Sequence, residues 1–222
     1  MFRIEDYTVK LLAQLKGAYA DRLLYVGLQG SFLRNEANEN SDIDIMVVID
    51  NLTAQDLAQY QKALIAIGDY EKSCGFICGK DDLANWNKLE ICHLLHTTRD
   101  IYGVLSNYLP EYTTEDVRSY IKLSVGNLYH ELCHRYVHSD PENNIKMLPI
   151  TCKQIFFIMQ NLYYYKNQVF FNSKHELLTH LTGIDAEVLS LSLSLQSSEE
   201  YDFDYSFNLL LSWCQITLEC TS

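Results

Sequence analysis

Two aspartates separated by a single residue have the types and spacing that most directly suggest chemistry in this chain. Asp42 and Asp44 open the apolar run IDIMVVI within the longer segment GSFLRNEANENSDIDIMVV. Successive strand residues point to opposite faces of a sheet, so these two carboxylates would share one face and repel each other. Mg²⁺ takes carboxylate oxygens together with substrate phosphates and would relieve that repulsion. The spacing therefore predicts that Asp42 and Asp44 are Mg²⁺ ligands.

The pair Gly30-Ser31 closes the preceding apolar run and adds a second chemical feature. Gly30 has no Cβ to keep a phosphate away from the backbone, and Ser31 offers a hydroxyl and an N–H group. Together with the two aspartates, this turn predicts a seat for a metal-bound triphosphate. The alternative is purely structural, with Asp42 capping the strand and Asp44 solvated at its edge.

Alternating helix and strand patterns over residues 1–109 would position these groups. Apolar spacing predicts a helix over residues 4–18, and Thr53 with Asp56 predicts a capped helix over residues 54–67. Asp81 and Asp82 are expected to open a short helical turn. Four short apolar runs predict strands over residues 23–29, 43–49, 74–78 and 90–95. The first half is therefore expected to be a mixed β-sheet with flanking helices.

The pattern becomes helical after Pro110. Helices are predicted over residues 120–136, 150–165 and 205–220, and a capping box at Ser173 predicts a shorter helix that ends at Gly183. The alternating Ser-Leu run at 190–195 resembles a strand, but its helical setting argues against one. Residues 110–222 are thus expected to form an all-α bundle, which makes the whole chain α+β with two domains.

The Gly-Ser turn followed by Ser41, Asp42 and Asp44 resembles the signature of the DNA polymerase β-type nucleotidyltransferase superfamily. The length and two-part layout are similar to the antibiotic nucleotidyltransferases, especially the aminoglycoside adenylyltransferases. The resemblance implies an Mg²⁺-dependent enzyme with Asp42 and Asp44 on the metal and Gly30, Ser31 and Ser41 at the nucleotide phosphates. It implies transfer of a nucleoside monophosphate, AMP from ATP, to a hydroxyl of a small molecule such as an aminoglycoside-like antibiotic.

A weaker resemblance covers the run QNLYYYKNQVFFNSKHELLTHL, in which Lys174 is the expected nucleotide contact. One departure concerns the third carboxylate that the family places on the next strand, because Cys74 or Gly75 stands at that position here. A thiol is a poor Mg²⁺ ligand, so we expect the general base to come from the helical domain, with Glu131 as the first candidate. The alternative is a nucleotide-binding regulatory module or a toxin–antitoxin protein with weak or no turnover.

A rival motif lies in YHELCHRYVH, where His130-Glu131-Leu132-Cys133-His134 matches the zinc metalloprotease pattern H-E-x-x-H. The extended form of that motif needs a glycine and a third histidine at set spacing, and RYVHSD does not supply them. We therefore interpret His130, His134 and His138 as polar neighbours on a helix edge and expect no zinc.

Composition narrows the remaining function classes. The chain has 222 residues and a formal net charge of −12, with both halves acidic, so we expect no nucleic-acid partner. No apolar run is long enough to span a membrane, and the acidic start MFRIEDYTVK is unlike a signal peptide. Seven scattered cysteines fit free thiols in a reducing compartment, so we expect a cytoplasmic protein. The sequence does not indicate the oligomeric state.

Overall fold

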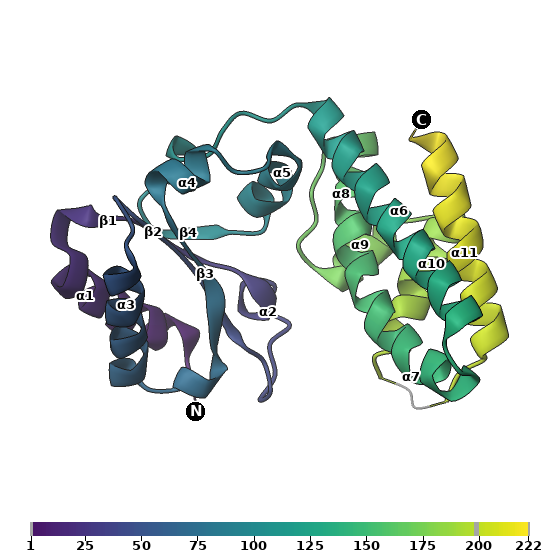
Figure 1. The fold of residues 1–222 in the computed structure, drawn as a ribbon, viewed down its shortest axis with the longest axis horizontal. Helices are drawn as coiled ribbons and strands as arrows, with labels where there is room; N and C mark the ends of the chain where they lie inside the picture. The colour runs from purple at the N-terminus through teal and green to yellow at the C-terminus, as the bar shows by residue number, and fades with distance from the viewer. Residues whose placement is uncertain (1, 198–199, 222) are drawn as a thin grey trace. The chain divides into compact units, whose positions relative to one another are not determined.

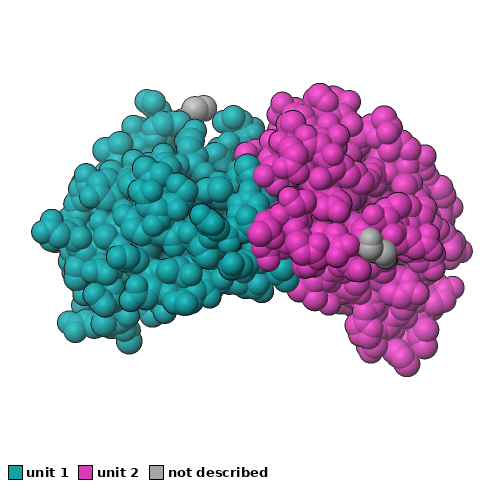
Figure 2. Space-filling model, turned by 90° about the horizontal axis from the view of Figure 1, so that it is seen from above, with its two compact units in different colours: residues 1–112 teal, residues 113–222 magenta. Residues whose placement is uncertain are grey.

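The computed structural model describes residues 2–197 and 200–221 of the chain. It divides into two compact units, residues 1–112 and 113–222, which Figure 2 shows in separate colours. The outer limits of the two predicted domains, residues 1 and 222, lie outside the described residues. The boundary after residue 109 stays a prediction.

The first unit is a four-stranded mixed sheet with helices against it (Figure 1). The strand order is β3-β2-β1-β4, so β2 lies between β3 and β1. Strand β2 pairs with β1 antiparallel and with β3 parallel, and β1 pairs with β4 antiparallel. In chain order the elements are α1 (Ile4–Tyr19), η1 (Ala20–Arg22), β1 (Leu23–Leu28), α2 (Gly30–Leu33), β2 (Ile43–Ile49), α3 (Ala54–Ile67), η2 (Tyr70–Lys72), β3 (Ser73–Gly79), α4 (Lys80–Ala84), α5 (Lys88–His96), β4 (Arg99–Tyr102) and η3 (Leu105–Asn107).

The alternation of strand β2 separates two apolar clusters on the two faces of the sheet. Its odd-numbered residues pack with α1 and α3, whose buried side chains include Leu11, Leu15 and Ala63. Met46 and Val48 face the other way and pack with Tyr25, Leu83 and Leu105. Asp42 and Asp44 have even numbers, so they belong to this second face.

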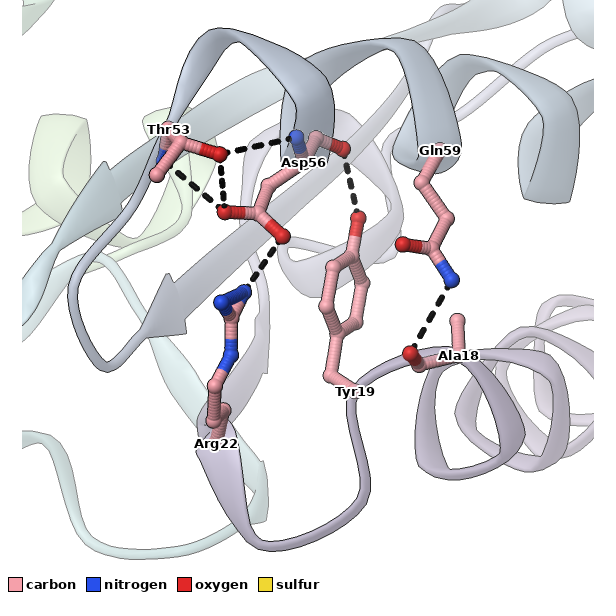
Figure 3. A network of polar contacts seen from close by, with 6 residues as sticks. All are labelled: Ala18, Tyr19, Arg22, Thr53, Asp56 and Gln59. Carbon is pink, nitrogen blue, oxygen red and sulfur yellow. Dashed lines mark hydrogen bonds and ion pairs between the residues drawn. The ribbon is translucent and has the colours of Figure 1, made fainter.

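Helix α3 begins and ends where the sequence predicts. Thr53 is the N-cap, and the Asp56 carboxylate accepts hydrogen bonds from the Thr53 backbone N–H at 2.8 Å and from its hydroxyl at 2.7 Å. Arg22 forms an ion pair with the same carboxylate, and the Tyr19 hydroxyl donates to the Asp56 carbonyl at 2.7 Å (Figure 3). The network joins the start of α3 to the end of α1 and to η1.

This network predicts acid-sensitive stability. The Thr53 hydroxyl, followed by the Thr53 backbone N–H and Arg22, lowers the pKa of Asp56 below its ordinary value of 3.8. A carboxylate with a lowered folded-state pKa adds stability above its unfolded-state pKa, and the contribution is lost as the pH falls through the folded-state value. We expect Asp56→Asn to lower the urea midpoint at pH 7 and to differ progressively less from the native chain below pH 3.8.

Asp21→Asn is the matched control, because Asp21 is exposed and adjoins Arg22 in the chain. Asp21→Asn should leave the urea midpoint nearly unchanged both at pH 7 and below pH 3.8. A constant difference between Asp56→Asn and the native chain from neutral to acid pH would contradict the assigned origin of the stability.

The predicted strand over residues 90–95 is wrong, since these residues lie in helix α5. Asn87 caps α5 by accepting a hydrogen bond from the Leu89 backbone N–H at 3.1 Å, and Ile91 and Cys92 are buried. A short apolar run fits a buried helix as well as a strand. The N-terminal cap formed by Asn87 favours the helix. The fourth strand is instead β4, whose first two residues are exposed.

The second unit is helical over all its described elements. Their buried side chains form its core, including Val125 and Leu128 of α6, Met159 and Leu162 of α8, and Leu210 and Trp213 of α11. The elements are α6 (Thr114–His138), α7 (Pro141–Thr151), η4 (Cys152–Gln154), α8 (Ile155–Asn167), α9 (Lys174–His180), α10 (Gly183–Ser194) and α11 (Phe203–Cys220).

The predicted helix over residues 150–165 is wrong at its start, because α7 ends at Thr151 and α8 begins at Ile155. Asp140 caps α7 ahead of a proline in the first turn, which the sequence reading missed. Pro149 lies inside α7 and cannot donate to the Ile145 carbonyl four residues earlier. The Tyr201 hydroxyl donates to that carbonyl instead, which explains how α7 tolerates the proline.

The predicted short helix begins as expected but ends early. Ser173 accepts a hydrogen bond from the Glu176 backbone N–H at 3.3 Å, and α9 ends at His180 rather than at Gly183. Gly183 starts α10, which contains most of the alternating Ser-Leu run. That run is therefore helical, as its helical setting predicted. Among the described residues, no helix is both long enough and apolar enough to cross a membrane.

Candidate active site

The two predicted metal ligands lie at the start of β2, and Asp44 shares the sheet face of Met46. Asp42 is exposed and precedes the strand, whereas Asp44 is half-buried within it. Burial raises the pKa of Asp44 above 3.8, and the negative charge of Asp42 raises it further. A hydrogen bond from Cys74 and the positive charge of Arg34 oppose that rise. Burial and a like charge therefore both disfavour the ionised form of Asp44.

The Gly30 turn packs directly against Asp44. The Gln29 backbone N–H donates to the Asp44 carbonyl at 2.9 Å, and Gly30 follows with φ of +69°. A Cβ atom on Gly30 would lie only 1.8 Å from Oδ2 of Asp44. Glycine is thus required twice here, for its left-handed backbone and for the space that the carboxylate occupies.

The two predicted serines lie in different elements, Ser31 within α2 and Ser41 in the loop between α2 and β2. Ser31 is half-buried in the first turn of α2, and its carbonyl accepts a hydrogen bond from the Glu36 backbone N–H at 3.0 Å. The Ser41 hydroxyl accepts a hydrogen bond from the Asn38 backbone N–H at 2.9 Å, which closes the turn before Asp42. Ser31 therefore adjoins the Gly30 turn, while Ser41 shapes the approach to the aspartates.

Cys74 stands beside Asp44 on the neighbouring strand. The parallel register pairs Asp44 with Cys74, so the residue in the third-carboxylate position is the thiol. Burial and the negative charge of Asp44 raise the pKa of Cys74 above 9.0, which keeps the thiol protonated near neutral pH. The Cys74 S–H group donates to the Asp44 carboxylate, since their hydrogen bond lowers one pKa and raises the other.

Arg34 is a site residue that the sequence reading missed. Its Nε donates to Oε2 of Glu36 at 3.0 Å, and both side chains are mostly buried. Its charge acts on Asp44 and also on His93, whose pKa burial lowers to about 4. Arg34 follows Ser31 by one helical turn, and its position just after the Gly-Ser pair was the available signal.

The donor set fits one hard divalent cation whose remaining ligands come from the substrate and from water. Mg²⁺ commonly uses one or two carboxylates and takes its other ligands from water and phosphates. Asp42 and Asp44 supply that pair, and cation binding would offset the repulsion that raises the pKa of Asp44. Within residues 2–197 and 200–221, no group of three or more His, Cys, Asp or Glu side chains could hold a metal by itself.

Substitution of Cys74, which stands in the third-carboxylate position, tests how that side chain affects cation binding by Asp42 and Asp44. Cys74→Ser keeps a small hydrogen-bond donor beside Asp44 and should leave Mn²⁺ affinity and nucleotide transfer within about threefold of wild type. Cys74→Asp adds a carboxylate and should tighten Mn²⁺ binding by about tenfold in calorimetric titration. Cys220→Ser, at an exposed thiol of the second unit, controls for general thiol loss. Unchanged Mn²⁺ affinity in Cys74→Asp would contradict the adjacency of Cys74 to the metal pair.

The other two predicted site residues lie in the second unit. Glu131 is on α6, where Oε1 accepts hydrogen bonds from Arg135 at 2.9 Å and Thr151 at 2.8 Å. Lys174 is the first residue of α9, with Nζ 5.8 Å from the centroid of the Phe156 ring. The structure thus brings Gly30, Ser31, Ser41, Asp42 and Asp44 together in the first unit and places Glu131 and Lys174 in the second.

The histidines of the rival motif form an exposed row on α6. The ring centroids of His130 and His134 are 5.8 Å apart, and those of His134 and His138 are 4.8 Å apart. Glu131 points its carboxylate to Arg135 and Thr151, so its described contacts are those of a structural ion pair rather than of a zinc centre. The absence of zinc stays a prediction.

The first comparison concerns the sheet unit. Residues 12–93 match the family model of the nucleotidyltransferase domain, a range that includes the Gly30 turn, both aspartates and Cys74. The first unit therefore carries a nucleotidyltransferase domain, and the prediction of an enzyme of the nucleotidyltransferase class is confirmed. A comparison with curated proteins gives no match.

The second comparison extends over both units. The chain is similar to the crystal structure of spectinomycin adenyltransferase AAD(9) from Enterococcus faecialis with ATP and spectinomycin. The TM-score is 0.61 at 15% sequence identity, and the match covers 97% of this chain and 99% of that one. This likeness confirms the predicted fold class, a nucleotidyltransferase sheet followed by a helical unit.

Proposed function

We propose that this protein transfers AMP from Mg²⁺-bound ATP to a hydroxyl group of a small molecule. The observation that carries the proposal is the packing of the Gly30 turn against Asp44, with Asp42 two residues earlier and its charge acting on Asp44. A phosphate-accepting turn and a carboxylate pair in contact are what a metal-bound triphosphate requires. The structural neighbour, which is named as an adenyltransferase and contains ATP and spectinomycin, supports adenylyl transfer from ATP to a small molecule.

Each residue of the first unit has a distinct part in the proposed reaction. Asp42 and Asp44 would hold Mg²⁺, which when bound neutralises phosphate charge and makes the acceptor hydroxyl easier to deprotonate. Ser31 and the backbone at Gly30 bind the phosphates that leave as pyrophosphate, and Arg34 adds positive charge at that end. Ser41 and, in the second unit, Lys174 are proposed as further nucleotide contacts on the strength of the family resemblance.

The proposed step is an in-line substitution at the α-phosphorus. The acceptor oxygen forms a bond to phosphorus while the bond from phosphorus to the bridging oxygen of the β-phosphate breaks. Pyrophosphate leaves, and the hydroxyl proton passes to a general base. Cys74 remains protonated near neutral pH and cannot accept that proton, so we propose Glu131 as the base.

Glu131→Gln tests the base directly. If the carboxylate accepts the proton, this substitution should lower kcat by about 10²–10⁴-fold with little change in the affinity for Mg²⁺-ATP. Turnover is measured as pyrophosphate release, and nucleotide affinity by calorimetry.

Thr151→Val is the matched control for the structural contacts of Glu131. It removes a hydrogen bond to Glu131 but leaves the carboxylate in place. It should lower the melting temperature slightly and keep most of the turnover. If both variants lose melting temperature and turnover in parallel, Glu131 serves to stabilise the helices rather than to accept the proton.

Titration with Mg²⁺-ATP, followed by pyrophosphate release with a panel of hydroxyl compounds, tests the function as a whole. Binding together with acceptor-dependent pyrophosphate release is the expected result. Nucleotide binding without release over the whole panel would favour the regulatory module instead. Failure to bind any nucleoside triphosphate would refute both.

A further inference from the structure

Arg34 and Glu36 contact each other in the turn that follows α2, although only one residue separates them in the chain. Side chains two positions apart on a helix do not face each other. Asn35 between them has φ of +57°, a left-handed conformation that asparagine tolerates. The Glu36 backbone N–H donates to the Ser31 carbonyl at 3.0 Å, which closes the turn. The turn therefore folds Glu36 back against Arg34 and against the start of α2.

The ion pair between these two residues is mostly removed from solvent. Nε of Arg34 donates to Oε2 of Glu36 at 3.0 Å, and the two side chains are 14% and 17% exposed. Nε is the inner nitrogen of the planar guanidinium group, so this contact fixes the plane of the group. A buried ion pair adds little to stability, because desolvation offsets the Coulomb attraction. What the pair explains better is the position of the Arg34 charge.

The carboxylate pair, Asp42 and Asp44, lies close to Arg34 as well. The Arg34 backbone N–H donates to the Gly30 carbonyl at 3.3 Å, and Gly30 packs directly against the Asp44 carboxylate. Burial raises the pKa of Asp44, and the positive charge of Arg34 opposes that rise. Removal of one partner from a buried ion pair leaves an uncompensated charge, which is strongly unfavourable. An Arg34 side chain released from Glu36 would therefore turn to the two aspartates.

We infer that Glu36 is a positioning residue that keeps Arg34 away from the carboxylate pair and directs its charge to the nucleotide phosphates. Without this contact, the guanidinium group forms an ion pair with Asp44 and Asp42 and competes with the divalent cation. The inference rests on the proposed metal-dependent transfer and adds a requirement to it, namely that the protein's own arginine must not occupy the cation site. Competition of this kind exists in the nucleotide-free protein, so turnover is not needed to detect it.

Mn²⁺ titration calorimetry of the nucleotide-free protein tests this competition. Glu36→Ala should weaken Mn²⁺ binding by about tenfold, because Arg34 then neutralises the carboxylates that hold the cation. The double variant Arg34→Ala/Glu36→Ala has no arginine to compete, so its Mn²⁺ affinity should return to within about threefold of wild type. Its turnover should remain at least about tenfold below wild type, because the phosphates lose the arginine charge.

Glu36→Gln separates the position of Arg34 from the charge of Glu36. Glutamine removes the same negative charge as alanine but keeps a side-chain oxygen that can accept from Nε of Arg34. Glu36→Gln should therefore keep Mn²⁺ affinity within about threefold of wild type. Glu115→Ala is the matched control, since it removes the carboxylate that Arg118 contacts at 2.8 Å in the second unit, and it should leave Mn²⁺ affinity unchanged.

Melting temperatures show whether each variant folds. If Glu36→Ala does not fold, Glu36→Asp takes its place. Aspartate keeps the charge but shortens the side chain by one methylene, so it should still weaken Mn²⁺ binding by about threefold.

Three results would overturn the inference. Wild-type Mn²⁺ affinity in Glu36→Ala, or in Glu36→Asp if alanine prevents folding, would show that Arg34 does not turn to the carboxylates. Equal weakening in Glu36→Gln and Glu36→Ala would reduce the effect to the loss of a negative charge. A loss of affinity that persists in the double variant would assign it to a cause other than Arg34. Failure of wild-type protein to bind Mn²⁺ would instead count against the proposed metal pair itself.

Discussion

Asp44→Asn and Asp42→Asn should each lower nucleotide transfer by about 10³-fold or more while the fold persists. Each substitution removes one of the two charges that would hold the cation at the start of β2. The effect on stability should be small or favourable, because burial and the charge of Asp42 raise the pKa of Asp44 in the free protein. Pyrophosphate release with Mg²⁺-ATP measures the loss, and Mn²⁺ titration should show the matching loss of cation affinity.

Asp50→Asn is the matched control, since Asp50 follows the other end of β2 and its backbone N–H donates to the Arg22 carbonyl at 2.8 Å. It removes the same charge without touching the carboxylate pair, and activity should stay within about twofold of wild type. Wild-type turnover in either Asp42→Asn or Asp44→Asn would remove the metal pair from the mechanism.

Gly30→Ala should cause the second large loss of turnover, and its cause is a steric clash rather than the loss of a charge. The new Cβ would lie 1.8 Å from Oδ2 of Asp44, and alanine would have to adopt φ of +69°. We expect a cost of about 1–3 kcal/mol in stability. Displacement of Asp44 by an ångström should lower turnover by about 10²-fold. Thermal unfolding and pyrophosphate release measure the two effects.

Gly126→Ala is a control that should raise stability, whereas Gly30→Ala should lower it. Gly126 lies inside α6 with no positive φ, and a Cβ there would meet nothing within 4 Å. Alanine should therefore stabilise the helix by up to about 1 kcal/mol and leave turnover unchanged. If Gly30→Ala were as harmless as Gly126→Ala, the close approach of the turn to Asp44 would have no functional consequence.

Elements with local signals could be predicted from the order of residues alone. Thr53 and Asp56 mark the start of α3 because a capping box needs only residues within one turn. The run after Asp42 predicts β2 with its correct bounds, since it is β-branched and too short for most helices. The pair Gly30-Ser31 with Asp42 and Asp44 is likewise readable, because one backbone connection brings both pieces to the same edge of the sheet.

Contacts between residues far apart in the chain became known from the folded structure. The run ICHLL carries no period that separates a strand from a helix, so the Asn87 cap and packing against the core determined α5. The position of Cys74 beside Asp44 depends on the register of β3 against β2, which involves residues thirty positions apart in the chain. The contact of Phe76 with Trp86 depends on that register and on the turn after α4. Sequence patterns report which face a residue occupies, but strand pairing and helix packing fix its neighbours, because those contacts join segments with no local constraint on each other.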